Sequence, residues 1–252
     1  GFSHQNPGFI SNILQKYDNF THVYLPADGN SMLVVLEKCL SSYNEVNVIV
    51  AGKTLEPRWL TQELARKSLE QGLMIWEFVS DPHPQIVIVG VGDYVTKEAL
   101  AAINIVRKET PRIKIRFVNI LVLSFFGFGH SESTMSVKVF NHYFTADKPV
   151  IFNFHGYPSV LQQLLFPIGN TSRFSIHGYI EQGSTTTPFD MHVRNKTSRW
   201  HLAKEIFTLM AEEKVISNQV AKKLNAKYDN KLADHRRYIQ QHGVDPTEVE
   251  QW

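Results

Sequence analysis

Residues 86–93 read IVIVGVGD and set the class of the fold. The first six of these residues are uncharged and mostly β-branched, which is typical of a strand buried on both faces of a sheet. Gly92 and Asp93 end the strand, and a helix is predicted from Thr96 to Thr110, where Pro111 stops it. A buried strand that leads so directly into a helix indicates an α/β fold.

The same alternation of strand and helix continues on both sides of this segment. Apolar, often β-branched runs predict strands at 22–25, 46–51, 73–78, 86–91, 114–120, 150–154 and 175–180. Apolar residues at helical spacing predict helices at 32–40, 61–71, 96–110, after the polar loop 127–136, at 160–166 and over most of 198–242. We therefore expect an α/β protein, with the strand at 46–51 buried like the one at 86–91.

A break in this series suggests two domains. Pro57 disfavours helix in the segment 54–59, which we interpret as a linker. Residues 1–53 then form the end of one α/β domain, and residues 54–252 form a second, complete one. A piece of 53 residues is short for a domain, so we expect its sheet to be incomplete, with strand edges exposed unless another part of the protein covers them.

The first residues favour a chain that begins inside a longer protein. Residues 1–8, GFSHQNPG, contain no initiator Met, no basic region and no apolar region of a signal peptide. The alternative is the processed N-terminus of a small protein.

Bulk composition excludes several classes of protein. The chain has 252 residues, of which 43% are hydrophobic, and a formal net charge of +2, so it gives no electrostatic reason to expect a nucleic-acid partner. No apolar run approaches the roughly 20 residues that span a bilayer, so we expect no membrane segment. The single cysteine, Cys39, rules out an internal disulfide and fits a reducing cytoplasm.

The common catalytic and cofactor motifs are absent. A dinucleotide fingerprint that starts at Gly90 would need glycine at its sixth position, where Val95 stands, so a tight strand-to-helix turn is the better interpretation. The 11 histidines form no HExxH pattern or Cys/His set with zinc-ligand spacing, and no GxSxG elbow occurs. The charges between Tyr228 and Tyr238 fit a solvated helix face. We therefore predict no metal site.

His4 and Lys53 are the two candidate site residues. His4 lies in a polar loop, and an imidazole exchanges protons near neutral pH, which suits a general acid or base. Lys53 follows the carboxyl end of the strand at 46–51, the place where α/β folds bind ligands. Its flexible point charge suits a phosphate monoester.

Several segments resemble the phosphoketolases in their order and spacing, and the resemblance covers nearly the whole chain. The matching segments are GFSHQNPG (1–8), YLPAD (24–28), NVIVAGK (47–53), DKPVIF (147–152), HGYP (155–158), GY (178–179) and TTTPFDM (185–191). The resemblance implies a three-layer α/β/α domain with a mixed sheet like the C-terminal domain of transketolase, preceded by the last part of a pyrimidine-binding α/β domain.

The resemblance also implies an activity. Phosphoketolases are large cytoplasmic dimers that use thiamine diphosphate and Mg²⁺. They convert xylulose 5-phosphate or fructose 6-phosphate, with inorganic phosphate, to acetyl phosphate and an aldose phosphate. This chain would be the C-terminal portion of such a lyase.

In that frame His4 matches an active-site histidine, and Lys53 matches a lysine that holds the sugar phosphate. Gln5 lies beside His4 without an assigned role. The chain contains no Gly-Asp-Gly motif, which thiamine enzymes use to bind Mg²⁺ and the diphosphate. We therefore expect no cofactor bound to this chain alone, and no activity without the rest of the protein.

Two alternatives remain open from the sequence. One is a stand-alone α/β ligand-binding or regulatory module that uses the turn at 90–93. The other is a transketolase, which transfers the two-carbon unit to an aldose; the segments 155–158 and 185–191 argue against it.

Overall fold

The computed structural model describes residues 7–15, 20–126, 135–180 and 185–250. The strands are β1 (Thr21–Tyr24), β2 (Val46–Ile49), β3 (Leu73–Ile75), β4 (Ile86–Val91), β5 (Ile115–Ile120), β6 (Val150–Phe154) and β7 (Phe174–His177). The helices are α1 (Gly8–Leu14), α2 (Gly29–Ser41), α3 (Gln62–Gln71), α4 (Asp93–Glu109), α5 (Val137–Phe144), α6 (Pro158–Leu165), α7 (Pro188–Arg194), α8 (Arg199–Glu212), α9 (Asn218–His242) and α10 (Thr247–Glu250).

A five-stranded mixed sheet forms the centre of the fold, with strand order β3-β5-β4-β6-β7. Strands β5, β4, β6 and β7 run parallel, whereas β3 is antiparallel to β5. The central strand β4 pairs on both edges, with Val89 opposite Val118 of β5 and Phe152 of β6. All six residues of β4 are buried, as their β-branched composition predicts.

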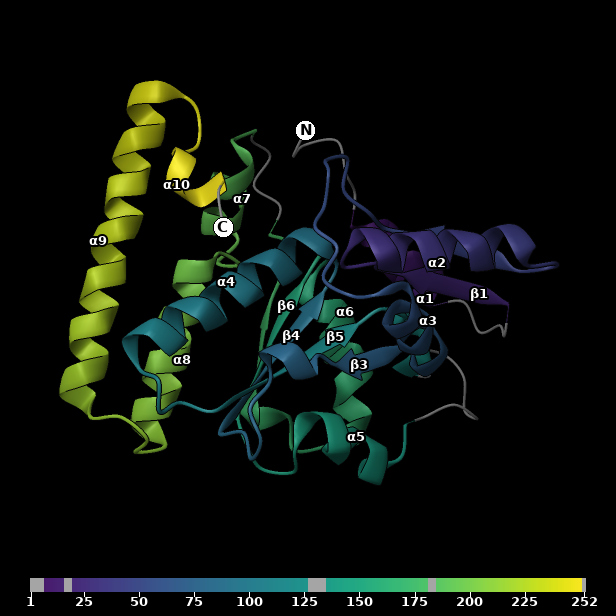
Figure 1. The fold of residues 1–252 in the computed structure, drawn as a ribbon, viewed down its shortest axis with the longest axis horizontal. Coiled ribbons are helices and arrows are strands. Elements are labelled where there is room, and N and C mark those ends of the chain that lie inside the picture. The colour runs from purple at the N-terminus through teal and green to yellow at the C-terminus, as the bar shows by residue number, and fades with distance from the viewer. Residues whose placement is uncertain (1–6, 16–19, 127–134, 181–184, 251–252) are drawn as a thin grey trace.

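Helices cover both faces of this sheet, so the predicted three-layer arrangement is confirmed (Figure 1). Alternate residues of β4 point to opposite faces. Ile86 and Ile88 belong to the core that includes α4 and α8, with α9 packed against α8. Val87 and Val89 belong to the core that includes α1, α5 and α6.

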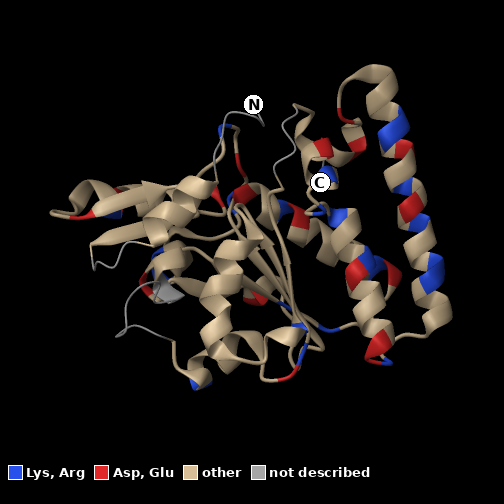
Figure 2. Cartoon of the chain, turned by 180° about the vertical axis from the view of Figure 1, so that it is seen from behind, with Lys and Arg blue, Asp and Glu red and all other residues tan. Residues whose placement is uncertain are grey.

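The 25-residue helix α9 forms an outer edge of the molecule. Charges of both signs follow it along its length (Figure 2). Several are paired, including Lys227 with Glu109 of α4 and Lys231 with Glu248 of α10. Leu224 and Tyr228 are buried on the opposite side of the helix. The prediction of a solvated helix face in this region is confirmed.

Residues 21–49 form a small β1-α2-β2 unit that extends from the main sheet. Its two strands are parallel, and no further strand joins them in the described part of the chain. The end of β1 meets the segment after β5, where Leu25 N–H donates to the Leu121 carbonyl over 2.8 Å. This contact and the shared core fasten the unit to the large sheet.

The prediction that the strand at 46–51 is buried is wrong. Strand β2 ends at Ile49, its first residue Val46 is exposed, and the other three are half-buried. The run has the composition of an interior strand, but only β1 pairs with it here. One covered edge leaves most of the strand in contact with solvent.

The segment 54–59 has no helix or strand, as predicted, but it is fastened to α2. Asp28 caps α2 by accepting the Ser31 N–H over 2.8 Å with Oδ1, and its Oδ2 accepts the Leu60 N–H over 2.9 Å. Gly29 N–H donates to the Pro57 carbonyl over 3.0 Å. The division into domains 1–53 and 54–252 stays a prediction, but the connection between them is not a free linker.

Other differences occur at the ends of elements. Strand β3 stops at Ile75 because a 3-10 turn occupies Glu77–Val79. Strand β7 ends at His177, where the chain passes close to the turn after β6: a Cβ on Gly178 would lie 2.3 Å from the Gly156 carbonyl oxygen. The short helices α1, α7 and α10 were not expected.

Among the described residues, no helix has the length and apolar character needed to span a bilayer.

Candidate functional site

Three loops meet at the carboxyl ends of β2, β4 and β6. They bring together Gly52 and Thr54 after β2, Asp93 and Tyr94 after β4, and His155 after β6. We call these five residues the junction cluster. It joins residues from Gly52 to His155 in the sequence and lies beside Lys53.

Asp93 is the anchor of the junction cluster. Its side chain is almost completely buried, and its Oδ2 accepts the Gly52 N–H. Its Oδ1 accepts the Tyr94 N–H over 2.7 Å and lies 3.3 Å from His155 Nδ1. Burial alone would raise the pKa of Asp93, but the hydrogen bond and charge of His155 and the two backbone N–H groups outweigh it, so the pKa lies below its usual range. The carboxylate is therefore ionised and satisfied by donors from three loops.

Two glycines make this close approach possible. Gly92 has φ +112°, and a Cβ there would lie 2.6 Å from the Cβ of His155. A Cβ on Gly52 would lie 2.6 Å from the Tyr94 hydroxyl oxygen and 2.9 Å from Asp93 Oδ2. The turn predicted at residues 90–93 thus lets the chain after β4 pack closely against His155. An acidic side chain already occupies the first turn of α4, which disfavours a phosphate at that position.

Hydroxyl groups hold the loop after β2 at Thr54, on the C-terminal side of Lys53. Thr54 Oγ1 donates to Glu56 Oε1 over 2.7 Å, so it accepts the proton of the Tyr94 hydroxyl over 2.9 Å. Burial raises the pKa of Glu56; the charge of Asp93 adds to this, while the Thr54 hydrogen bond and Lys97 oppose it. The Tyr94 ring stacks on His155, with ring centroids 6.3 Å apart. Lys53 is therefore flanked on both sides by residues fixed to α4.

Of the two site residues predicted from the sequence, the structure describes Lys53 but not His4. Lys53 is exposed, beyond the carboxyl end of β2 as predicted. His4 and its neighbour Gln5 lie outside the described residues. Sequence analysis did not single out Asp93, Tyr94 or His155 as site residues. The sequence signal for this site was an acidic residue, Asp93, directly after Gly92, at the point where a strand leads into a helix.

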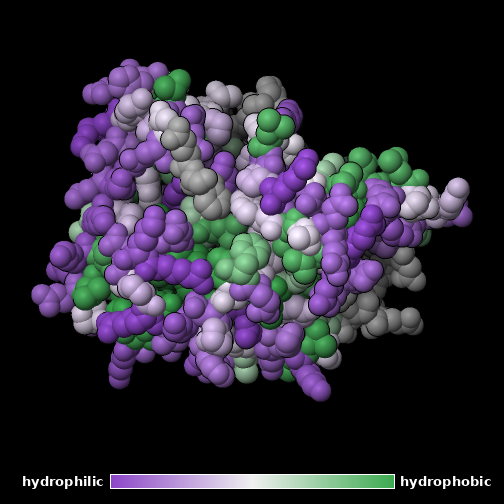
Figure 3. All heavy atoms as spheres, viewed as in Figure 1, coloured by the Kyte–Doolittle hydropathy of each residue, from purple (hydrophilic) through white to green (hydrophobic). Residues whose placement is uncertain are grey.

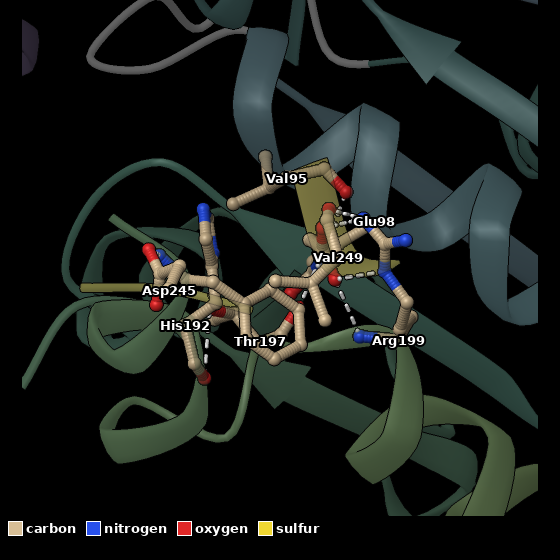
Figure 4. A network of polar contacts seen from close by, with 9 residues as sticks. Val95, Glu98, His192, Thr197, Arg199, Asp245 and Val249 are labelled. Carbon is tan, nitrogen blue, oxygen red and sulfur yellow. Dashed lines mark hydrogen bonds and ion pairs between the residues drawn. The ribbon is translucent and has the colours of Figure 1, made fainter. Parts of the chain in front are cut away.

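A second polar network lies next to the junction cluster and fixes the start of α8 (Figure 4). Glu98 of α4 receives hydrogen bonds from Arg199 Nε and Nη2 over 3.0 and 2.6 Å, and both side chains are buried. Arg199 also donates to the Val249 carbonyl over 3.2 Å. Asn153, at the end of β6, donates to the carbonyl oxygens of Val95 and Thr197. These bonds tie α4, β6, α8 and α10 together beneath the site.

His192 belongs to the same network. Its Nδ1 lies 2.9 Å from Thr197 Oγ1, and its ring contacts Tyr94 with centroids 6.5 Å apart. Burial lowers the pKa of His192, and the charges of His155 and Arg199 add to this although Glu98 opposes them. A neutral imidazole therefore supports Tyr94 from below.

No group of three or more His, Cys, Asp or Glu side chains within 7–15, 20–126, 135–180 and 185–250 could hold a metal ion.

Two family models match the sequence. The model described as the XFP C-terminal domain matches residues 53–252. The model of D-xylulose 5-phosphate/D-fructose 6-phosphate phosphoketolase matches residues 1–42.

Curated relatives match over the whole chain. A probable phosphoketolase from Brucella abortus is 43% identical over 256 residues, covering 100% of this chain and 32% of the relative. A probable phosphoketolase from Clostridium acetobutylicum is 38% identical with the same coverage. The chain thus spans about a third of the length of these relatives.

Solved structures support the fold. A transketolase mutant from Pichia stipitis superposes with a TM-score of 0.62 at 16% identity, covering 85% of this chain and 28% of that chain. The transketolase from Leishmania mexicana gives 0.59 at 14% identity, covering 88% and 28%. The expected transketolase-like α/β fold is confirmed by these matches. By its sequence, the chain belongs to the phosphoketolase family.

Proposed function

We propose that this chain acts as the C-terminal part of a thiamine-diphosphate-dependent phosphoketolase, a carbon–carbon lyase. The enzyme would convert xylulose 5-phosphate or fructose 6-phosphate, together with inorganic phosphate, to acetyl phosphate, an aldose phosphate and water. The observation that carries this proposal is 43% identity to a probable phosphoketolase across the entire chain. We expect the whole enzyme to be a cytoplasmic homodimer.

Lys53 would bind the phosphate of the sugar substrate. Its side chain is exposed, and its ammonium group on a flexible stem suits a phosphate monoester. The loop around it is held in place at Gly52 and Thr54. His4 would contact the substrate hydroxyls or assist proton transfer, as its match to the family motif implies.

We propose that thiamine diphosphate and Mg²⁺ are held by other parts of the enzyme. The sequence has no Gly-Asp-Gly motif, and the described residues contain no cluster that could hold a metal ion. Bound elsewhere in the enzyme, the cofactor and Mg²⁺ would supply the carbanion chemistry. We therefore predict that this chain by itself makes no acetyl phosphate.

The surface of α2 supports an association with further parts of the enzyme. Leu33, Leu36 and Leu40 follow one face of α2 and are 48%, 40% and 79% exposed. Figure 3 shows hydrophobic residues gathered over this region. A row of exposed leucines beside a two-stranded sheet is typical of a surface that another element covers. We propose that the rest of the same polypeptide covers it.

The choice of two-carbon acceptor tests the proposal. The full-length protein would receive xylulose 5-phosphate, thiamine diphosphate and Mg²⁺, with either inorganic phosphate or ribose 5-phosphate as acceptor. We expect acetyl phosphate that depends on inorganic phosphate. Transfer of the two-carbon unit to ribose 5-phosphate without acetyl phosphate would show a transketolase and refute the proposal.

A further inference from the structure

The residues on both sides of Lys53 contact the first turn of α4. Gly52 N–H donates to Asp93, and Thr54 contacts the hydroxyl of Tyr94. Asp93 and Tyr94 are the first two residues of α4, which belongs to the large sheet domain. Lys53 itself belongs to the loop that follows the small β1-α2-β2 unit.

Few other contacts hold the loop that contains Lys53. Before Gly52 the next contact is that of the Val50 N–H with the Tyr24 carbonyl over 2.9 Å, and after Thr54 the next contacts to another element are those of Pro57 and Leu60 with the start of α2. Lys53 and Leu55 are exposed, so packing does not set their position. The two contacts to α4 are therefore the nearest attachments on either side of Lys53, and they contribute to where its backbone lies.

Asp93 acts as an acceptor at both oxygens. Oδ2 accepts the Gly52 N–H, and Oδ1 accepts the Tyr94 N–H and faces His155 Nδ1. An asparagine has the same shape, but its NH₂ group is a donor and must face one of these N–H groups. Asp93→Asn is therefore the substitution that disturbs the attachment with the least change in volume.

We propose that Asp93 is a positioning residue for substrate binding: with His155 and Tyr94, it holds the loop 52–54 so that the Lys53 ammonium group meets the phosphate of the sugar substrate. This inference rests on the proposed phosphate-binding role of Lys53. The C-terminal domain then contributes to substrate affinity through the backbone of Gly52. A shift of about 1 Å in a binding group is enough to weaken its contact substantially.

The test is a double-mutant cycle in the full-length enzyme, with Lys53→Ala, Asp93→Asn and the two combined. The measured quantities are KM and kcat for xylulose 5-phosphate, and the Kd of xylulose 5-phosphate for the cofactor-free protein by calorimetry. We expect each single substitution to raise KM and Kd about tenfold, the scale of one charge-assisted hydrogen bond, with kcat changed much less. In the Lys53→Ala background, Asp93→Asn should have no further effect, because it acts through Lys53.

Asp81→Asn is the matched control. Asp81 also has a lowered pKa: hydrogen bonds from Ile115 N–H and Arg107 outweigh its desolvation, but it lies before the amino end of β4. The Asp81→Asn substitution should leave KM and Kd for xylulose 5-phosphate unchanged. Hydrogen exchange gives a direct structural readout, since the Gly52 amide should exchange faster in Asp93→Asn and stay protected in Asp81→Asn.

The outcomes distinguish the phosphate-binding role of Lys53 from the positioning role of Asp93. An unchanged KM in Lys53→Ala would remove Lys53 from the phosphate site and overturn the inference with it, while acetyl phosphate production would still support the family activity. Additive effects of the two substitutions, or an unchanged KM in Asp93→Asn, would overturn the inference alone. If Asp93→Asn does not fold, Gly52→Ala applies the same cycle, because its Cβ must displace the loop from Tyr94.

Discussion

Asp93 shows how a single buried carboxylate links parts of the chain that are far apart in sequence. Its two oxygens face donors from Gly52 in the loop after β2, from Tyr94 in the first turn of α4 and from His155 in the turn after β6. Hydrogen bonds to a charged, desolvated acceptor are worth more than those between neutral groups, about 1.5–3 kcal/mol each. Sequence patterns could place Lys53 after a strand, but not its anchor, because the partner of Gly52 lies 41 residues away. A pattern of residue types records local structure and carries no direct record of such long-range contacts.

Asp93 should also make the stability of the protein sensitive to acid. Its folded-state pKa is lowered, so its contribution to stability is present above the unfolded pKa of about 3.9 and is lost as the pH falls through the folded pKa. Asp93→Asn should therefore be less stable than the wild type at pH 7, and this difference should shrink below about pH 4. Urea unfolding at pH 7, 5 and 3.5 measures it. Glu212 is exposed, so Glu212→Gln serves as a control. A stability difference between Asp93→Asn and the wild type that is constant with pH would contradict the expectation.

Helices and strands with long, regular patterns were predicted well. The strand at 86–91 has the predicted bounds, and the helix after it ends near the predicted residue but begins at Asp93, three residues before Thr96. Continuous β-branched residues and helical spacing reflect burial directly, which explains the agreement. The short helices α7 and α10 were missed: α7 has 7 residues and α10 has 4, too few for a period to show. The exposure of β2 was missed because composition does not reveal how many neighbours a strand has.

Asp28 should stabilise both α2 and the connection that follows β2. Asp28→Ala removes the α2 cap and leaves the buried Leu60 N–H without its acceptor, so we expect a loss of about 2–4 kcal/mol. Trypsin should also cleave after the exposed Arg58 more rapidly. Ser136→Ala removes only the exposed cap of α5 and should cost about 1 kcal/mol without changing that cleavage. Equal losses for the two substitutions would contradict the dual role of Asp28.

The molecule as a whole is a layered domain whose helices are joined by buried polar contacts as well as by apolar packing. The order of elements predicted an α/β fold, and the family resemblance implied the three-layer arrangement and the mixed sheet that the structure has. The contacts between Glu98 and Arg199 could not be predicted, since they join α4 to α8 over 101 residues. The sequence pattern placed Lys53 after the strand at 46–51, but the environment of Lys53 depends on how β2, β4 and β6 meet in three dimensions.

The Glu98–Arg199 pair should behave as a coupled unit. Removing either partner leaves a buried charge without compensation, so Glu98→Ala and Arg199→Ala should each cost about 3–5 kcal/mol. The double substitution should cost less than the sum of the two. Urea unfolding of the three variants measures the coupling, with the exposed pair Lys231–Glu248 as a control worth at most about 1 kcal/mol. Additive losses at Glu98 and Arg199 would show that the two side chains do not depend on each other.

The most direct test of the phosphoketolase assignment compares the full-length protein with this 252-residue chain in one assay. Each receives xylulose 5-phosphate, inorganic phosphate, thiamine diphosphate and Mg²⁺, and acetyl phosphate is measured. We predict acetyl phosphate from the full-length protein and none from the isolated chain, because the sequence has no Gly-Asp-Gly motif and we propose that the cofactor is held by other parts of the enzyme. Absence of acetyl phosphate from the full-length protein would contradict the assigned activity, and its formation by the isolated chain would contradict the placement of the cofactor elsewhere.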